Sequence, residues 1–137
     1  MKNITHIKKE NIRDKVISEI KKAKKEILAT LEVTEEIRSP LPKSYFLLLS
    51  KKKKEGLKIN RVVFGSKKVY YTYLKDHKLK KIPFNGKHTV SKNYKRMIMI
   101  DGAKLFFSRK ISGKNKFYFT VNPIIVQDYK RYFKKLY

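Results

Sequence analysis

The chain has no cysteine, and glycine and proline are sparse, with 5 and 4 residues among 137. Without cysteine, a disulfide framework, a thiolate zinc site and a thiol nucleophile are all excluded. No long run rich in proline, glycine and serine occurs, which argues against a disordered chain. The N-terminus lacks the apolar core of a signal peptide, and no stretch approaches the roughly 18 apolar residues that cross a bilayer. These absences predict a cytoplasmic globular protein without an integral membrane segment.

Acidic residues are also scarce. The chain has 11 Asp and Glu against 36 Lys and Arg, which gives a formal net charge of +25. Ion-pair networks for heat stability need acids in comparable number, so most of these cations lack a partner. A polyanion relieves their mutual repulsion, and nucleic acid is the commonest polyanion in cells. We expect DNA or RNA as the partner; the alternatives are an anionic membrane or another acidic partner, or no functional polyanion.

The chain has enough hydrophobic residues to form one core. Hydrophobic residues make up 41%, with 9 Tyr and 8 Phe. A chain of this length buries roughly two thirds of its unfolded surface in one compact unit, so we expect a single domain over residues 1–137. The three histidines, His6, His77 and His88, are scattered, and we expect each in a surface loop. They show no metal-ligand spacing, so neither a metal nor a cofactor is predicted.

Apolar periodicity and turn residues divide the chain into helices and strands. Helices are expected at about 10–24, 42–55, 66–76 and from Pro123 to the end; strands at 25–33, 57–65, 94–100, 104–109 and 116–121. Gly56 is expected in the left-handed position that ends the second helix. The expected buried side of the last helix carries Ile124, Ile125, Tyr129, Tyr132, Phe133 and Leu136. The stretch 35–42 is expected to be irregular because of its prolines, and a basic loop follows Asp76. Alternation of helix and strand is typical of an α/β fold with parallel strands. Asp101-Gly102 is a type I′ hairpin signal, and Asn122 is expected to cap the last helix.

Four local pieces carry a family resemblance: "IKKAKKEILATLEV", "KKKKEGLKINRVVFG", "YKRMIMIDGAKLFFS" and "YKRYFKKL". Together they resemble the phospholipase D-like fold, a mixed α/β sheet flanked by helices that occurs in phosphodiesterases, nucleases and non-catalytic relatives. The family carries an H-x-K-x4-D motif. Aligned on Asp101, the chain has Tyr94 in place of the histidine and Arg96 in place of the lysine. The family's downstream Gly-Ser falls at Ser108-Arg109.

The resemblance implies a phosphate site without a nucleophile. In the family the histidine attacks phosphorus and the lysine holds a phosphate oxygen. Arginine remains a good phosphate ligand, whereas tyrosine, with a pKa near 10, is a poor nucleophile. No catalytic residue is therefore expected. The expected phosphate or nucleic-acid contacts are Tyr94, Lys95, Arg96, Ser108, Arg109 and Lys110. Single-motif members pair two copies at the motif, so a homodimer is implied in which Tyr94, Arg96 and Asp101 face their symmetry mates.

Each of these residues also has a structural interpretation. Asp101 can serve the turn alone, and Tyr70, Tyr71 and Tyr73 suit a core as well as base stacking. The run Ser50–Lys54 is most simply a solvated helix end, although it can also supply nonspecific phosphate contacts. Our hypothesis is a catalytically inactive, regulatory phospholipase D-like domain that binds nucleic acid. The alternatives are an active phosphodiesterase or nuclease with Tyr94 as nucleophile, and a basic interaction module for acidic lipid or protein.

Overall fold

The computed structural model describes residues 4–38, 42–76 and 85–137. The strands are β1 (Ile4–Ile7), β2 (Glu26–Glu32), β3 (Lys58–Phe64), β4 (Asn85–Thr89), β5 (Met97–Ile100), β6 (Lys104–Ile111) and β7 (Lys114–Thr120). The helices are α1 (Ile12–Lys21), α2 (Val33–Arg38), α3 (Lys43–Lys54), α4 (Lys67–Asp76) and α5 (Pro123–Leu136), with a short 3-10 turn before α1. None of the described helices is long and apolar enough to span a bilayer.

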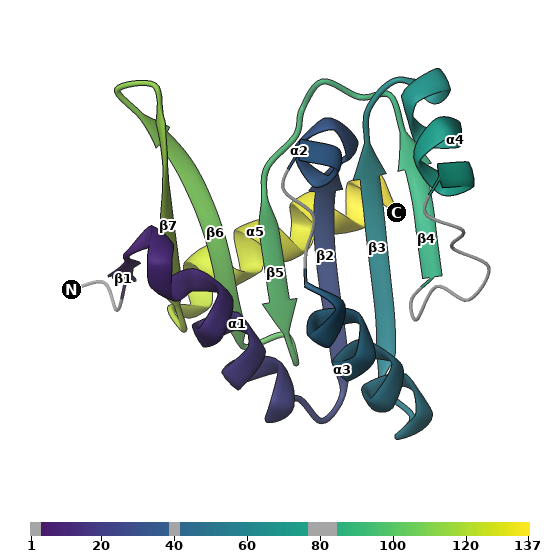
Figure 1. The fold of residues 1–137 in the computed structure, drawn as a ribbon. Coiled ribbons are helices and arrows are strands. Elements are labelled where there is room, and N and C mark those ends of the chain that lie inside the picture. The colour runs from purple at the N-terminus through teal and green to yellow at the C-terminus, as the bar shows by residue number, and fades with distance from the viewer. Residues whose placement is uncertain (1–3, 39–41, 77–84) are drawn as a thin grey trace.

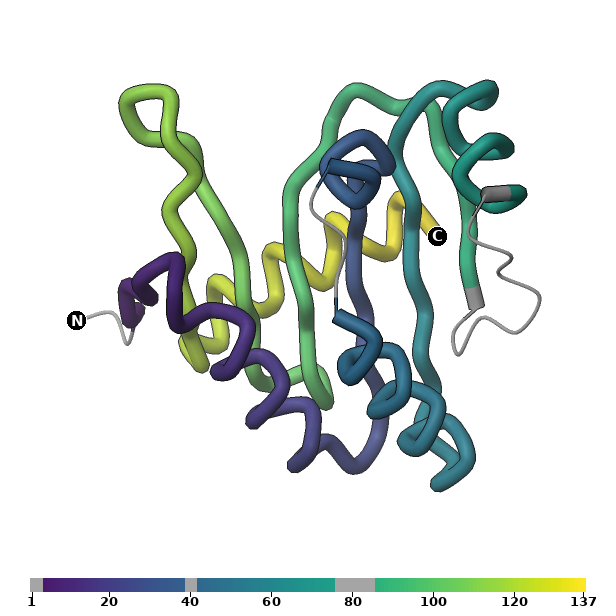
Figure 2. Tube along the Cα trace, viewed as in Figure 1, coloured from purple at the N-terminus to yellow at the C-terminus, as the bar shows by residue number. Residues whose placement is uncertain are grey.

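The described strands form one sheet in the order β1-β7-β6-β5-β2-β3-β4 (Figure 1). β2, β3 and β4 run parallel, whereas β5, β6, β7 and β1 join by antiparallel pairing. Figure 2 shows that α5 crosses one face of this sheet while α1 and α3 cover the other. A mixed sheet flanked by helices is the α/β fold that the sequence predicted, and the prediction is confirmed.

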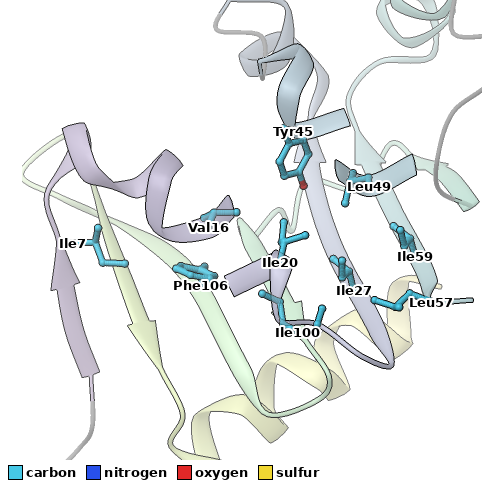
Figure 3. Packing of buried hydrophobic residues seen from close by; sticks show 11 residues of the cluster. Ile7, Val16, Ile20, Ile27, Tyr45, Leu49, Leu57, Ile59, Ile100 and Phe106 are labelled. Carbon is cyan, nitrogen blue, oxygen red and sulfur yellow. The ribbon is translucent and has the colours of Figure 1, made fainter. Parts of the chain in front are cut away.

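Each face of the sheet has its own hydrophobic cluster. Under α1 and α3, the apolar stripes of the two helices meet strand residues such as Ile27 and Ile100 (Figure 3). Under α5, Val126 and Phe133 meet Met97, Met99, Leu105 and Phe107. Alternation along β5 and β6 divides their side chains between the two faces. The sheet is therefore buried on both sides, which explains why β2 and β3 read as nearly continuous apolar runs.

The turn and cap predictions are confirmed. Asp101 and Gly102 have φ of 56° and 67°, as a type I′ turn requires, and Gly56 has φ of 96° after α3. The Asn122 side chain accepts hydrogen bonds from the backbone nitrogens of Ile124 and Ile125. These positions were predictable because only a few residue types suit positive φ or a helix N-cap.

Other predictions are wrong. β1 and β4 were not expected, and β4 lies where a basic loop was predicted. α2 forms in the stretch expected to be irregular, because the Glu32 carboxylate accepts from the backbone nitrogens of Thr34 and Glu35 and so caps the helix. On α5, Ile124 was assigned to the buried side but is 74% exposed, whereas Val126 is buried.

Two of the three histidines lie on strands rather than in loops. His6 belongs to β1 and is exposed. His88 belongs to β4; its Nε2 lies 2.9 Å from the Gly65 carbonyl oxygen, and its ring stacks on Tyr70 at 4.4 Å. His77 falls outside the described residues. Within those residues, no three His, Asp or Glu side chains gather as metal ligands.

Candidate functional site

The strand directions bring the expected site residues to one edge of the sheet. The parallel strands β2, β3 and β4 all end at this edge, so β5, which is antiparallel to β2, begins there. β6 in turn ends there, and β7 begins there. Lys95 and Arg96, before β5, therefore share the edge with Arg109 and Lys110, at the end of β6. Ligands of open α/β sheets bind beyond the carboxyl ends of the parallel strands, which is this edge.

Two side-chain hydroxyls hold the segment before β5. Thr30 Oγ1 donates to the Lys95 carbonyl at 2.6 Å and accepts from the Met97 nitrogen at 3.0 Å. Tyr132 Oη accepts from the Lys95 nitrogen at 2.8 Å and donates to the Asn93 carbonyl at 2.6 Å. These hydroxyls bind backbone N–H and C=O groups that would otherwise be available to pair with a neighbouring strand. β5 consequently begins at Met97, three residues later than the predicted strand.

Half of the predicted contacts line one cleft on the α5 face. Its volume is about 430 Å³, and its described lining residues are Lys95, Ser108, Arg109, Ile125, Asp128 and Tyr129. Lys95 Nζ lies 5.8 Å and 5.2 Å from the ring centres of Tyr129 and Tyr132. The Arg109 guanidinium carbon lies 5.3 Å from the Phe107 ring centre. Both cations thus rest on aromatic faces, where cation–π attraction contributes about 0.5–1 kcal/mol each at an exposed site.

The electrostatics of the cleft favour an anion. Among the described residues, no carboxylate forms an ion pair with Lys95 or Arg109. Asp128 lines the same cleft, but it pairs with Arg131 at 3.3 Å. Burial raises the pKa of Tyr129 above its ordinary value, although the nearby Arg109 cation partly opposes this. Its phenol therefore stays protonated and remains a hydrogen-bond donor at neutral pH.

Arg96 lies elsewhere at the edge. Its Nη1 is 3.2 Å from Glu35 Oε2, and its guanidinium carbon lies 5.3 Å from the ring centre of Phe117. The side chains of Arg96 and Glu35 are 43% and 36% exposed, so the ion pair is solvated. Such exposed pairs contribute about 0–1 kcal/mol. Arg96 is therefore neither buried against an acid nor part of the cleft that Lys95 and Arg109 line.

Tyr94 is half-buried and packs into the cluster under α5. Its ring centre lies 5.0 Å from that of Phe64. Burial raises the pKa of Tyr94 well above its ordinary value, and the Glu35 carboxylate raises it further. Both effects disfavour the phenolate, which is the form that attacks phosphorus. The position that corresponds to the family's nucleophile thus holds a protonated, packed phenol.

Asp101 lies at the far end of β5. Its carboxylate accepts from the backbone nitrogens of Lys24, Lys25 and Glu26 at 2.7–3.2 Å. Burial alone would raise the pKa of Asp101, but these donors outweigh it and hold the pKa below its usual value. Five residues of extended chain separate Asp101 from Arg96 by roughly 17 Å. Asp101 therefore anchors the turn at the opposite edge, as its structural interpretation expected, and the expectation that Tyr94, Arg96 and Asp101 face their symmetry mates stays a prediction.

The sequence interpretation missed three of the cleft and edge groups. Tyr129 and Tyr132 were assigned only to the buried side of α5, although both also lie under Lys95. Lys116 was placed in a strand without a role, but it pairs directly with Arg109 across the hairpin. One signal was available: no acidic residue occurs between Asp101 and Asp128, so every charged residue in that interval is a cation.

The tyrosines of α4 were expected either in the hydrophobic core or at the surface, where they could stack on bases. Tyr73 is buried against Val33 and Val63, and burial raises its pKa to about 12. Tyr71 is 57% exposed, and Tyr70 stacks on His88. The core interpretation therefore holds for Tyr73, whereas Tyr71 remains on the surface.

Comparison with known proteins identifies the fold but no family. No family model matches the chain, and no curated protein does. Among solved structures, TrmBL2, described as an archaeal chromatin protein with a novel mode of DNA binding, matches with a TM-score of 0.71 and 15% identity. Polyphosphate kinase from Porphyromonas gingivalis matches with a TM-score of 0.68 and 15% identity.

The two matches cover nearly all of this chain but only part of each neighbour. They include 97% and 99% of the chain, and the chain spans 51% of the TrmBL2 length and 26% of the kinase length. At this identity the likeness shows the fold alone. Both neighbours agree with the phospholipase D-like architecture that the sequence pieces indicated.

Proposed function

We propose that the chain is a catalytically inactive member of the phospholipase D-like superfamily that binds nucleic acid through phosphate contacts in a regulatory role. One observation carries the proposal: Lys95 and Arg109 share a cleft at the ligand-binding edge of the sheet and have no carboxylate partner among the described residues. The net charge of +25 supplies the long-range attraction to a polyanion. TrmBL2, which is described as binding DNA, contains this fold in 51% of its length and so gives a precedent for a DNA-binding protein that includes the fold.

The contacts follow from the chemistry of each group. Arg109 offers a planar, permanently charged fork to phosphate oxygens, and Lys95 offers a point charge. Ser108 is also among the residues that line the cleft, although alternation along β6 directs its hydroxyl to the face opposite to that of Arg109. Arg96 and Lys110 lie at the same edge of the sheet but outside the cleft; because the Arg96 pair with Glu35 is solvated, a phosphate replaces Glu35 at little cost. Tyr94, as a protonated phenol, contributes a hydrogen bond at most.

The binding experiment measures fluorescence anisotropy of a labelled DNA duplex at several salt concentrations. Each phosphate contact contributes about 0.9 to the slope of log affinity against log salt. Lys95→Gln with Arg109→Gln should therefore lower the slope by about 1.8. Lys51→Gln with Lys53→Gln removes the same charge from exposed positions at the end of α3 and serves as the control. Equal losses in the two double variants would contradict the assignment of the cleft.

The rival hypothesis is an active phosphodiesterase or nuclease in which Tyr94 is the nucleophile. Its test incubates pure protein with labelled single-stranded and double-stranded DNA and RNA. We expect no cleavage, because burial raises the pKa of Tyr94 and its ring packs against Phe64, which both disfavour an attacking phenolate. Cleavage by the unmodified chain that disappears in Tyr94→Phe would instead establish the enzyme.

Two further parts of the hypothesis stay predictions. The resemblance to single-motif family members implies a homodimer, and analytical ultracentrifugation should give about twice the chain mass of 16.4 kDa. The lipid alternative predicts that the protein floats with anionic vesicles but not with neutral ones. Flotation that exceeds nucleic-acid binding at the same salt concentration would favour the lipid partner.

A further inference from the structure

The β6–β7 hairpin extends beyond the body of the sheet. In Figures 1 and 2 its tip stands clear of β5 and α2 at the same edge. Residues Arg109 to Lys116 are all exposed, whereas Leu105, Phe106 and Phe107 on the same strand are buried. Ser112 and Gly113 form the turn with φ of 52° and 78°. The exposed part is a two-stranded ribbon anchored in the core by the β6 aromatics.

Cations lie on both faces of this ribbon, three on one face and one on the other. In the antiparallel register Arg109 lies opposite Lys116, Lys110 opposite Asn115, and Ile111 opposite Lys114. Directly opposed residues project from the same face, and successive residues alternate. Arg109, Lys114 and Lys116 therefore share the face that continues into the Lys95 cleft, and Lys110 projects from the other face. No acid lies on the hairpin, because the interval from Asp101 to Asp128 contains none.

We propose that this hairpin enters the major groove of a B-form DNA duplex, a proposal that rests on the nucleic-acid binding proposed above. The dimensions agree. Three exposed residues on each strand extend about 10 Å, and the major groove is about 8.5 Å deep. The groove is about 12 Å wide and admits a two-stranded β-ribbon. Cations on both faces of the ribbon then meet phosphates on both walls of the groove.

The composition of the tip favours a duplex over a single strand. Proteins that bind single strands stack bases on exposed aromatic side chains. The exposed part of the ribbon, "RKISGKNK", contains no aromatic residue, and Phe107 and Tyr118 behind it stack on one another at 5.4 Å. Ile111 at the tip is 41% exposed. An apolar tip gains nothing from phosphate, but it suits the thymine methyl groups on the groove floor.

The same geometry favours DNA over duplex RNA. The major groove of A-form RNA is deep and narrow, so side chains do not read it. The minor groove of RNA is wide and shallow, so a ribbon in it would not have a phosphate backbone close to each of its two faces. A hairpin with cations on both faces therefore distinguishes B-form DNA from an RNA duplex of the same sequence.

The test compares two triple variants of equal charge. The hairpin variant carries Lys110→Gln, Lys114→Gln and Lys116→Gln, and it leaves Lys95 and Arg109 in place. The control carries Lys51→Gln, Lys53→Gln and Lys54→Gln, three exposed lysines at the opposite edge. Each is titrated against duplex DNA, single-stranded DNA and duplex RNA of one sequence, and circular dichroism confirms that both variants fold.

We expect the hairpin variant to lower the salt slope for duplex DNA by about 2.7, which is three contacts at about 0.9 each. The control should lower it by less than about 1, since it removes only long-range attraction. On single-stranded DNA and duplex RNA, the two variants should behave alike.

Three results would overturn the hairpin proposal. They are equal losses for the two variants on duplex DNA, an equal loss for the hairpin variant on single-stranded DNA, and a larger loss on duplex RNA than on duplex DNA. Failure of the unmodified chain to bind any of the three nucleic acids would instead overturn the proposed function itself. The two failures are therefore distinguishable.

Discussion

Removing the Asp101 carboxylate should destabilise the fold without abolishing nucleic-acid binding. Three backbone nitrogens, those of Lys24, Lys25 and Glu26, donate to this carboxylate. A hydrogen bond to a charged group contributes about 1.5–3 kcal/mol, but the three share one partly exposed carboxylate and do not add fully. We expect Asp101→Gly to lower the free energy of unfolding by about 2–4 kcal/mol. Glycine is the right replacement because it accepts the positive φ of 56° without strain.

Asp101→Asn removes the charge of the side chain but keeps its size, so it measures the electrostatic part of the contribution to stability. Asparagine tolerates positive φ and keeps one acceptor oxygen, so its cost at neutral pH should be smaller, about 1–2 kcal/mol. The pKa of Asp101 is lowered in the folded chain, so its contribution is present above the unfolded pKa of about 3.9. That contribution is lost as the pH falls through the folded pKa. The difference between the unmodified chain and Asp101→Asn should therefore shrink in acid.

Urea unfolding followed by circular dichroism measures both effects, at neutral pH and near pH 3. A loss below about 0.5 kcal/mol for Asp101→Gly would refute the role of the carboxylate as an anchor. A difference between the unmodified chain and Asp101→Asn that stays constant in acid would refute the electrostatic part. Loss of DNA binding by folded Asp101→Gly would return Asp101 to the functional site.

Three further substitutions test single contacts within the fold. Gly65→Ala should destabilise by about 2–5 kcal/mol in a thermal melt, because φ is +148° and a Cβ would lie 2.3 Å from Val33 Cγ1; a neutral result would contradict the contact. Lys52→Met should cost about 2–4 kcal/mol in urea unfolding, since buried Nζ donates to two carbonyls at the end of α1; a more stable variant would show that these carbonyls find other donors. Tyr132→Phe should cost about 1–2 kcal/mol and weaken DNA binding severalfold, because its hydroxyl holds the segment that carries Lys95; unchanged affinity would show that the segment holds its position without it.

The parts of the fold that the sequence predicted are those with a local cause. Helix periodicity, the Asn122 cap and the Asp101-Gly102 turn each depend on a few neighbouring residues. β4 was missed because "NGKHT" lacks a strand's apolar pattern. β4 is also an outermost strand of the sheet and pairs only with β3. β1 is a short edge strand that pairs only with β7. Edge strands are set by their partner, which a single sequence does not identify.

The candidate site was predictable in its location but not in its arrangement. The motif register predicted Lys95 and Arg96 at one site with Arg109, and the structure brings these residues to one edge of the sheet. Neighbouring residues of an extended segment project to opposite sides, so Lys95 joins Arg109 in the cleft while Arg96 pairs with Glu35. Glu35 belongs to a helix that the sequence did not indicate. The pairing of Arg96 was therefore outside what local patterns determine.

The most direct test of the central claim is the salt dependence of DNA binding by the unmodified chain. Affinity for a duplex, measured between about 50 and 200 mM salt, should fall linearly on logarithmic axes. Contacts from Lys95, Arg96, Arg109, Lys110, Lys114 and Lys116 predict a slope near −5.4, at about 0.9 for each of the six. A slope near zero, or no binding at the lowest salt concentration, would contradict the proposal that these cations bind phosphate.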